Sequence, residues 1–320
     1  MEFFKNKNVL VVGGTGFVGT NLLLRLIDSG AHIRSTRHKR PARIEDKRIK
    51  YIDCDLTLMD DCRKVVKDID YVFHCAANTQ GAAVTEKNPL AHVTPNIVMN
   101  AQLLEASYFA KVKKFLWLGS STGYPPSGDR PVKEEEIMEG EPYEKYYCVG
   151  WMKRYTEVLC RIYAEKLNPT MQTIVIRPTN IYGDYDDYDF ATSHVFAALI
   201  RRVVERRNPL EVWGTGDDVR DLIYVGDFVD AMLEAMEKVD AFMQFNVGLG
   251  KAYSIKEILQ MMIDIDGFKD AKVVYDPEKP SMIPIRLVDI SRAQTTFGFQ
   301  PKTEIEEGIK NTLTWYRENK

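Results

Sequence analysis

The residue pattern with the clearest chemical meaning is a glycine-rich turn near the N-terminus. Gly13, Gly16 and Gly19 follow the apolar segment 8–12 with the spacing G-x-x-G-x-x-G. Glycine at such positions permits a tight turn, close approach of the backbone to a pyrophosphate, and close packing of a helix on a strand. The amides at the start of the following helix face the phosphate charge. The pattern therefore predicts a dinucleotide-binding turn, whose other residues are Thr15, Phe17 and Val18.

The end of the second expected strand carries the residues that select between NAD and NADP. An acidic residue there holds the ribose 2′-hydroxyl, whereas an arginine accommodates a 2′-phosphate. The stretch 33–39 contains no acid and several cations, among them Arg37. It favours NADP, with NAD as the alternative if these cations are only solvated surface charges. Asp55 and Leu56, which follow the third expected strand, are expected to contact the adenine.

The turn must be positioned by strands and helices that alternate along the first half of the chain. Short apolar runs predict strands, and apolar residues at helical spacing predict helices. The expected strands are 8–12, 31–36, 50–53, 71–75, 115–119 and 173–177, and the expected helices are 20–29, 97–110, 150–165, 195–207 and 255–265. This alternation predicts an α/β fold with a doubly wound parallel (Rossmann) sheet and a smaller C-terminal substrate-binding region.

The regular alternation ends near Pro178, which suggests a division of the chain. Residues 1–180 are expected to form a dinucleotide-binding Rossmann domain, joined by part of 219–247. Residues 181–320 are expected to form mainly the substrate-binding region. Prolines and an Asp- and Tyr-rich loop at 184–189 interrupt this second part.

The composition excludes several classes of partner. A net charge of −3 over 320 residues gives no electrostatic reason to bind nucleic acid or an acidic membrane. The five cysteines contain no C-x-x-C pair, which argues against a disulfide framework and a structural zinc site, so no metal is expected. A polar N-terminus leaves no room for a signal peptide, and the apolar runs are too short to span a membrane. A reduced, cytoplasmic location is expected.

Four segments together resemble the extended short-chain dehydrogenase/reductase family, which includes the NAD-dependent epimerases and dehydratases. They are 13–19, 74–77, 118–124 and 177–183, of which the second adds Ala76 and Ala77 as cofactor contacts. Within the family the chain is most similar to the GDP-L-fucose synthases, which are reductase–epimerases of GDP-4-keto-6-deoxymannose. That likeness extends through 193–202, 213–221 and 280–292. The resemblance implies a nucleotide-sugar substrate, GDP-linked, and a homodimer.

The resemblance also implies a Ser/Thr, Tyr and Lys set around the nicotinamide. In this family the tyrosine transfers a proton to or from the sugar oxygen, and the lysine lowers the tyrosine pKa and binds the nicotinamide ribose. Ser120 and Lys153 match the serine and the lysine, but Val149 occupies the tyrosine position. Three alternatives follow: a displaced tyrosine such as Tyr147 acts, the proton passes through Ser120, Thr122 or water, or catalysis is weakened.

A second departure concerns epimerisation. The GDP-L-fucose synthases epimerise two carbons with a cysteine and a histidine, and here His194 matches the histidine while Thr122 replaces the cysteine. A threonine hydroxyl is a far poorer base than a thiolate. The expected reaction is therefore oxidation or reduction at C4 of a GDP-linked 4-keto-6-deoxy sugar, without double epimerisation. A single epimerisation through His194 remains open.

The expected substrate site is also carried over from the resemblance. Arg202 and Arg220 match positions that hold the substrate diphosphate, since guanidinium groups suit phosphate oxygens. Trp213 lies in a stretch near the nucleoside, and Asn180 and Arg286 complete the expected site.

Two other functions stay open at this point. One is a nucleotide-sugar epimerase that retains its NAD(P), against which the basic end of the second strand counts. The other is a binding protein that has lost its catalytic tyrosine, against which the retained Ser120, Lys153 and His194 count. The family dimerises through the helices expected at 97–110 and 150–165.

Overall fold

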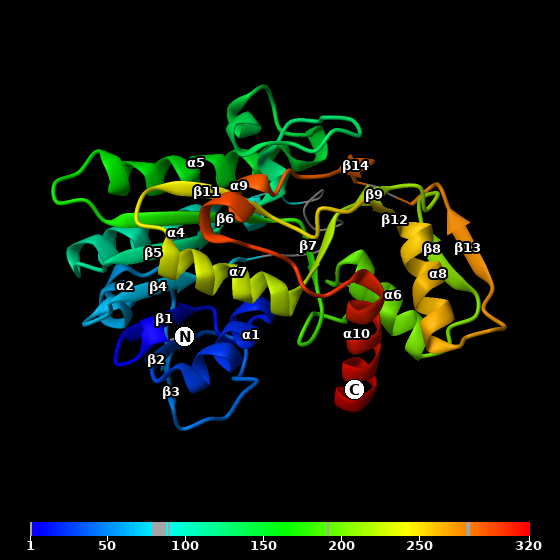
Figure 1. Cartoon of the computed structure of the whole chain (residues 1–320), viewed down its shortest axis with the longest axis horizontal. Coiled ribbons are helices and arrows are strands. Elements are labelled where there is room, and N and C mark those ends of the chain that lie inside the picture. The colour runs from blue at the N-terminus through cyan, green and yellow to red at the C-terminus, as the bar shows by residue number, and fades with distance from the viewer. Residues whose placement is uncertain (1, 79–87, 89, 191, 280–281) are drawn as a thin grey trace.

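The computed structural model describes the chain apart from residues 1, 79–87, 89, 191 and 280–281, so Pro280, at the start of one family-like segment, lies outside the described residues. Its centre is a seven-stranded sheet in the order β11-β6-β5-β4-β1-β2-β3, in which every neighbouring pair is parallel (Figure 1). The strands are β1 (Asn8–Val12), β2 (His32–Arg37), β3 (Ile49–Asp53), β4 (Tyr71–His74), β5 (Lys114–Leu118), β6 (Gln172–Pro178) and β11 (Met243–Val247). The strand order reverses between β1 and β4, which opens a crevice at their carboxyl ends.

Helices cover both faces of this sheet, as a doubly wound fold requires. Val9–Val12 are all fully buried, because each face of β1 packs against a helical layer. One layer consists of α1 (Phe17–Leu26), α7 (Val225–Lys238) and α9 (Ser291–Phe297). The other consists of α2 (Met59–Val66), α4 (Leu90–Phe109) and α5 (Tyr147–Glu165). The predicted fold class is confirmed.

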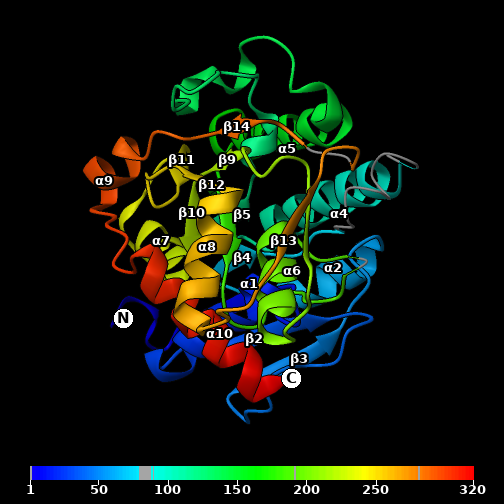
Figure 2. The ribbon, with the colours of Figure 1, turned by 90° about the vertical axis from the view of Figure 1, so that its right-hand side faces the viewer.

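A third apolar core lies in the C-terminal part of the chain (Figure 2). It is built mainly by α6 (Val195–Val204), α8 (Ile255–Asp266) and α10 (Ile305–Asn319). Three small sheets accompany it: β7 (Asn180–Tyr182) with β10 (Leu222–Tyr224), β8 (Leu210–Trp213) with β13 (Val273–Asp276), and β9 (Val219–Arg220) between β12 (Tyr253–Ser254) and β14 (Ile285–Arg286).

Several helix boundaries differ from the sequence-based expectations. α4 begins at Leu90 rather than 97, and it includes Pro95 as its sixth residue, at the expense of one internal hydrogen bond. α5 begins at Tyr147 rather than 150, because the 3₁₀ turn Glu144–Tyr146 leads into it. Gly30 adopts the left-handed conformation (φ 74°) expected of a C-cap. All five cysteines are free. Among the described residues, no helix is both long and apolar enough to cross a bilayer.

Candidate active site

The glycine-rich turn joins β1 to α1 and is packed too closely to accept side chains. Gly13 has a φ of 81°, and a Cβ there would lie 2.7 Å from the backbone of Ala76. A Cβ at Gly19 would lie 2.2 Å from the carbonyl oxygen of Gly13. Gly16 is the N-cap of α1 and has no side chain to cap it. The first amides of α1 therefore remain available to a pyrophosphate, so this turn fits a dinucleotide.

The other expected cofactor residues lie along the carboxyl ends of neighbouring strands. Ala76 and Ala77 follow β4, beside the turn, and Phe17 and Val18 begin α1. Thr15 is buried within the turn, and Leu56 is buried below the end of β3. Asp55 accepts hydrogen bonds from the amide and hydroxyl of Thr57 at 3.0 and 2.7 Å, which lower the pKa of its carboxyl.

Arg37 has a partner that the sequence-based reasoning missed. It donates two hydrogen bonds to Asp53 at 2.7 and 3.0 Å, and these raise its pKa. Asp53 ends β3 directly opposite Arg37 in the parallel ladder. An acid therefore reaches the end of β2 from the neighbouring strand. Because both side chains are exposed, a cofactor phosphate can displace this partner at little cost.

The turn after β5 holds two hydroxyl groups together. Ser120 precedes the 3₁₀ turn Ser121–Gly123, and its Oγ accepts hydrogen bonds from the amide and the hydroxyl of Thr122 at 3.1 and 2.9 Å. α5 is pressed against this turn, since a Cβ at Gly150 would lie 2.9 Å from the Thr122 carbonyl oxygen. Arg154 adds a hydrogen bond of 2.8 Å to the Gly123 carbonyl.

Lys153 points from α5 toward the same turn. Its Nζ donates to the Leu118 carbonyl at 3.0 Å and lies 4.7 Å from the centre of the Trp117 ring. Burial lowers its pKa to about 8, although Glu157 opposes the shift. The structure thus brings Ser120, Thr122 and Lys153 to one end of β5, as expected for a hydride-transfer site.

A buried ion pair fixes the helix that carries Lys153. Glu157 of α5 accepts two hydrogen bonds from Arg177 of β6, at 2.9 and 2.5 Å, and both side chains are almost completely buried. Arg177 also donates to the Tyr124 hydroxyl at 2.6 Å. Removing one partner of such a pair typically costs about 3–5 kcal/mol, so the pair holds α5 in place.

Tyr147 is not brought to this site, which corrects the expectation that it replaces the missing tyrosine. Its side chain is 50% exposed and lies on the outer face of α5 with Trp151 and Tyr155. Six residues correspond to about 240° on a helix, so Tyr147 and Lys153 point in different directions. The neighbouring Tyr146 is half-buried and faces inward, although sequence reasoning did not select it.

His194 lies on a different element from the catalytic turn, as the N-cap of α6. The residue is exposed at the surface. Desolvation by the protein around the imidazole nevertheless lowers its pKa, and the charge of Asp187 opposes this shift. In the described part of the chain, no hydrogen bond joins it to Ser120 or Thr122. Asn180 begins β7, and its backbone amide donates to the Asp221 backbone carbonyl at 3.3 Å.

Two of the expected substrate arginines lie side by side. Arg220 and Arg286 are direct partners in the β9–β14 ladder, and both are less than 10% exposed. Arg220 pairs with Asp218 at 3.1 Å. Arg286 donates to the carbonyls of Tyr124 and Pro125 at 3.2 and 3.1 Å.

Burial lowers the pKa of Arg286 to about 10, and Arg220 adds to this. The pair therefore has the character of an anion site. Arg202 is not part of it, because it lies on α6 over the Phe190 ring and faces Glu211. Trp213 is 47% exposed at the end of β8, as a nucleoside platform would be.

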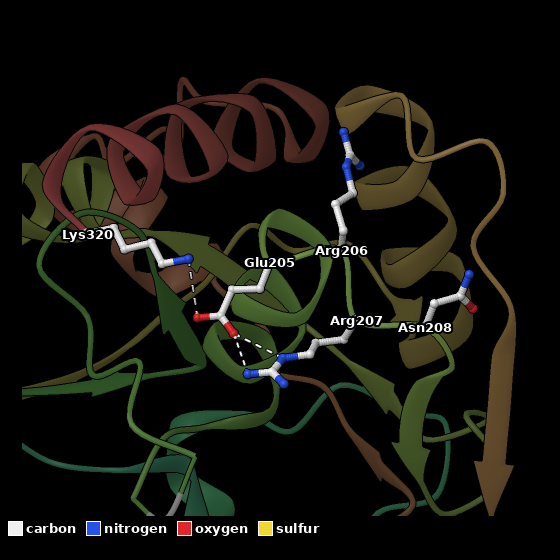
Figure 3. Close-up of a pocket in the computed structure, with 5 residues that line it drawn as sticks. All are labelled: Glu205, Arg206, Arg207, Asn208 and Lys320. Atoms are coloured by element: carbon white, nitrogen blue, oxygen red, sulfur yellow. Dashed lines mark hydrogen bonds and ion pairs between the residues drawn. The ribbon is translucent and has the colours of Figure 1, made fainter.

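A separate polar groove of about 650 Å³ lies at the opposite end of α6 from His194 (Figure 3). Arg207 and Lys320 both pair with Glu205, at 3.0 and 3.4 Å, and Arg206 pairs with Asp266. These charges are compensated within the protein, and the groove is not part of the candidate active site.

Comparison with known proteins gives relatives over nearly the whole chain. A GDP-L-fucose synthase of Sinorhizobium fredii is 28% identical, covering 100% of this chain and 98% of that protein. The UDP-glucose 4-epimerase of Thermotoga maritima, solved with UDP-glucose, superposes with a TM-score of 0.87 at 27% identity over 97% of this chain and 99% of that one. MoeE5, solved with UDP-glucuronic acid and NAD, gives a TM-score of 0.85 at 25% identity over 98% and 100%.

The sequence pattern of the NAD dependent epimerase/dehydratase family matches residues 9–248, which include the glycine turn, Ser120 and Lys153. The chain belongs to the NAD-dependent epimerase/dehydratase family.

Proposed function

We propose that the protein is an NAD(P)-dependent oxidoreductase that acts at C4 of a GDP-linked 4-keto-6-deoxy sugar, without double epimerisation. The meeting of Ser120, Thr122 and Lys153 at the cofactor edge of the sheet carries the proposal. The Sinorhizobium relative supports a GDP-linked sugar, and the two structural relatives support a nucleotide sugar in general.

In this proposal Ser120 replaces the missing tyrosine as the proton donor. Thr122 donates both its amide and its hydroxyl to the Ser120 oxygen, so the Ser120 hydrogen is left for the sugar oxygen. Ser120 gives its proton as negative charge develops on that oxygen, the Thr122 hydroxyl passes its own proton to Ser120, and solvent water returns a proton to Thr122. A reduced nicotinamide cofactor, whose pyrophosphate the glycine turn would hold, would supply the hydride.

Lys153 supplies positive charge in the same mechanism. With a pKa of about 8 it is mostly protonated at neutral pH, and its bond to the Leu118 carbonyl fixes its direction. It stabilises the developing oxyanion and binds the nicotinamide ribose. Val149, one turn earlier on α5, offers no group for proton transfer.

Thr122 and His194 support the absence of double epimerisation. Proton removal beside a carbonyl needs a base, and the threonine hydroxyl is bound to Ser120 rather than to a histidine that could deprotonate it. His194 is the N-cap of α6, and among the described residues no hydrogen bond joins it to Thr122. We therefore expect this site to epimerise at most one carbon of the sugar.

We propose NADP as the cofactor, with NAD as the alternative. Arg37 is the candidate 2′-phosphate ligand, and its pairing with Asp53 orients the guanidinium at the end of β2. The NAD bound by MoeE5 supports the alternative. With NAD retained, the same site would serve a 4-epimerase, a second candidate that the Thermotoga relative favours.

We further propose a homodimer formed through α5. Its outer face carries an apolar stripe at helical spacing, with each side chain at least 37% exposed: Tyr147, Trp151, Tyr155, Val158 and Ile162. Such a stripe is typical of a surface that packs on another helix. The expected result is a dimer in sedimentation equilibrium that Trp151→Glu dissociates. The five free cysteines support a reducing compartment, the cytoplasm.

The decisive test adds GDP-4-keto-6-deoxymannose to the purified protein with NADPH, and separately with NADH. Loss of reduced-nicotinamide absorbance, with retention of the C3 and C5 configurations, is the expected result. If neither reduced cofactor is consumed and protein released by denaturation contains bound NAD(P), the retained-cofactor epimerase replaces this proposal. If dinucleotide binds exchangeably without any turnover, the protein is a binder.

A further inference from the structure

The inward-facing residue at the start of α5 is Tyr146. It ends the 3₁₀ turn Glu144–Tyr146 and is the N-cap of the helix. Its side chain is half-buried, whereas that of Tyr147 beside it is 50% exposed. Two adjacent tyrosines therefore have opposite environments, and only Tyr146 belongs to the interior of the site.

Helix geometry relates Tyr146 to Lys153. Seven residues turn the helix by about 700°, within about 20° of two full turns, and advance it by about 10 Å. The two side chains therefore leave α5 on the same face, two turns apart. A substrate lying along this face would meet Lys153 at one end and Tyr146 at the other.

The surroundings of Tyr146 are the anion site rather than the hydride-transfer site. β9 and β14, which carry Arg220 and Arg286, lie beside the beginning of α5 in both views (Figures 1 and 2). Burial raises the pKa of the Tyr146 phenol, while Arg220 and Arg286 are close enough to oppose that shift. The phenol is therefore neutral at pH 7 and able to donate a hydrogen bond. Lys153 instead faces Glu157.

The arginine pair has unused capacity toward a ligand. Arg286 is 4% exposed, yet its Nε has no hydrogen-bond partner among the described residues. No carboxylate is bonded to Arg286 in the described part of the chain either, since its Nη1 and Nη2 both donate to backbone carbonyls. A buried guanidinium with a free donor favours an anion, and a neutral phenol adds a donor without adding charge.

We propose that the Tyr146 hydroxyl binds the substrate diphosphate together with Arg220 and Arg286, and that this contact sets how far the sugar reaches toward Lys153. The inference rests on the proposed nucleotide-sugar substrate. Tyr146 is a positioning residue in this role. It does not replace the proton donor that Val149 lacks.

The test compares Tyr146→Phe with Tyr147→Phe, which removes a hydroxyl from the adjacent, outward-facing side chain. Binding of GDP, GDP-mannose and guanosine to the NADP-loaded protein is measured by calorimetry. Tyr146→Phe is expected to weaken GDP and GDP-mannose equally, by about tenfold, because a hydrogen bond to a charged group is lost. Guanosine, which has no phosphate, is expected to bind as before. Tyr147→Phe is expected to change none of the three.

Kinetics and a folding control complete the test. Tyr146→Phe is expected to raise KM and also to lower kcat, because the sugar is no longer held at a fixed distance from Lys153, at an unaltered thermal midpoint. If GDP binds wild type and Tyr146→Phe equally, the role of Tyr146 is overturned while the nucleotide-sugar proposal stands. If wild type binds neither GDP nor UDP, the nucleotide-sugar proposal itself fails, and this inference fails with it.

Discussion

The cofactor edge, which is the glycine turn after β1, and the catalytic turn after β5 lie on the same side of the sheet with β4 between them, yet they are built in different ways. At the cofactor edge the geometry is made by backbone: Gly13 and Gly19 approach other main-chain atoms so closely that no side chain fits. At the catalytic turn it is made by side chains, with Ser120, Thr122 and Lys153 held by hydrogen bonds. A substitution at the first region would destroy the shape, whereas a substitution at the second changes the chemistry and leaves the shape intact.

Val149 illustrates the second case. We propose that it stands where the family places a tyrosine, and Lys153 nevertheless bonds the Leu118 carbonyl and the Arg177–Glu157 pair holds α5. The contacts that hold Lys153 and α5 in place therefore do not depend on which residue occupies position 149. This separation makes the catalytic turn open to gain of function, whereas a side chain added to the glycine turn offers only loss.

The largest expected effect is a gain from Val149→Tyr. The new phenol lies one turn from Lys153, whose positive charge lowers its pKa and readies it to donate. Since a positioned general acid contributes about 10²–10⁴-fold, kcat for 4-keto-sugar reduction is expected to rise within that range. Val149→Phe supplies the same ring without a hydroxyl and is expected to give no gain. Equal activity of the two variants would show that the proton path does not pass through this position.

The next largest effect is the loss of dinucleotide binding in Gly19→Val. A Cβ there lies 2.2 Å from the Gly13 carbonyl, so the turn must open. Overpacking of this kind costs about 1–3 kcal/mol, which corresponds to roughly 10–100-fold in NADPH affinity by fluorescence titration. Gly128→Ala, outside the turn, is the control for a general loss of stability: its φ of 64° strains the backbone of an alanine, but no atom lies within 4 Å of the added Cβ. Unchanged NADPH affinity in Gly19→Val would contradict the backbone-built description.

The difference between the two regions also explains what sequence reasoning predicted. The strand–turn–helix around Gly13 and the buried strands such as Val9–Val12 are set by local spacing and periodicity, and both are found where expected. Ser120, Lys153 and the absence of a tyrosine at Val149 were identified through the family pattern. Their catalytic roles stay predictions.

The features that sequence reasoning missed depend on strand register, on where a helix begins, and on which element carries a residue. Asp53 meets Arg37 only because β2 and β3 are neighbours in register. The placing of Tyr146 inside and Tyr147 outside depends on where α5 begins, and a 3₁₀ turn moved that start. Arg202 was grouped with Arg220 by sequence pattern, although α6 carries it away from the β9–β14 pair. Register and helix phase are tertiary properties, and a single sequence does not contain them explicitly.

A smaller effect is expected from pH. Burial lowers the Lys153 pKa to about 8, so its charge is present below that pH and is lost as the pH rises through it. kcat/KM is expected to fall about tenfold between pH 7 and pH 9, in step with the charged fraction. Lys153→Arg, which stays charged, is expected to lose this alkaline limb at lower activity. The lowered pKa of His194 places its titration on the acidic side, away from this limb.

The smallest expected effect tests the ion pair between Arg37 and Asp53, at the ends of β2 and β3. Arg37→Ala is expected to weaken NADPH binding by about fivefold and leave NADH unchanged, because an exposed ion pair contributes at most about 1 kcal/mol. Asp53→Asn is the opposing variant: it removes the acid that shares Arg37 and is expected to strengthen NADPH binding by a similar factor. Opposite signs for the two variants would place the 2′-phosphate at Arg37. A parallel loss for NADH and NADPH would instead show that the Arg37–Asp53 pair only supports the ends of β2 and β3, and that the choice of cofactor lies elsewhere.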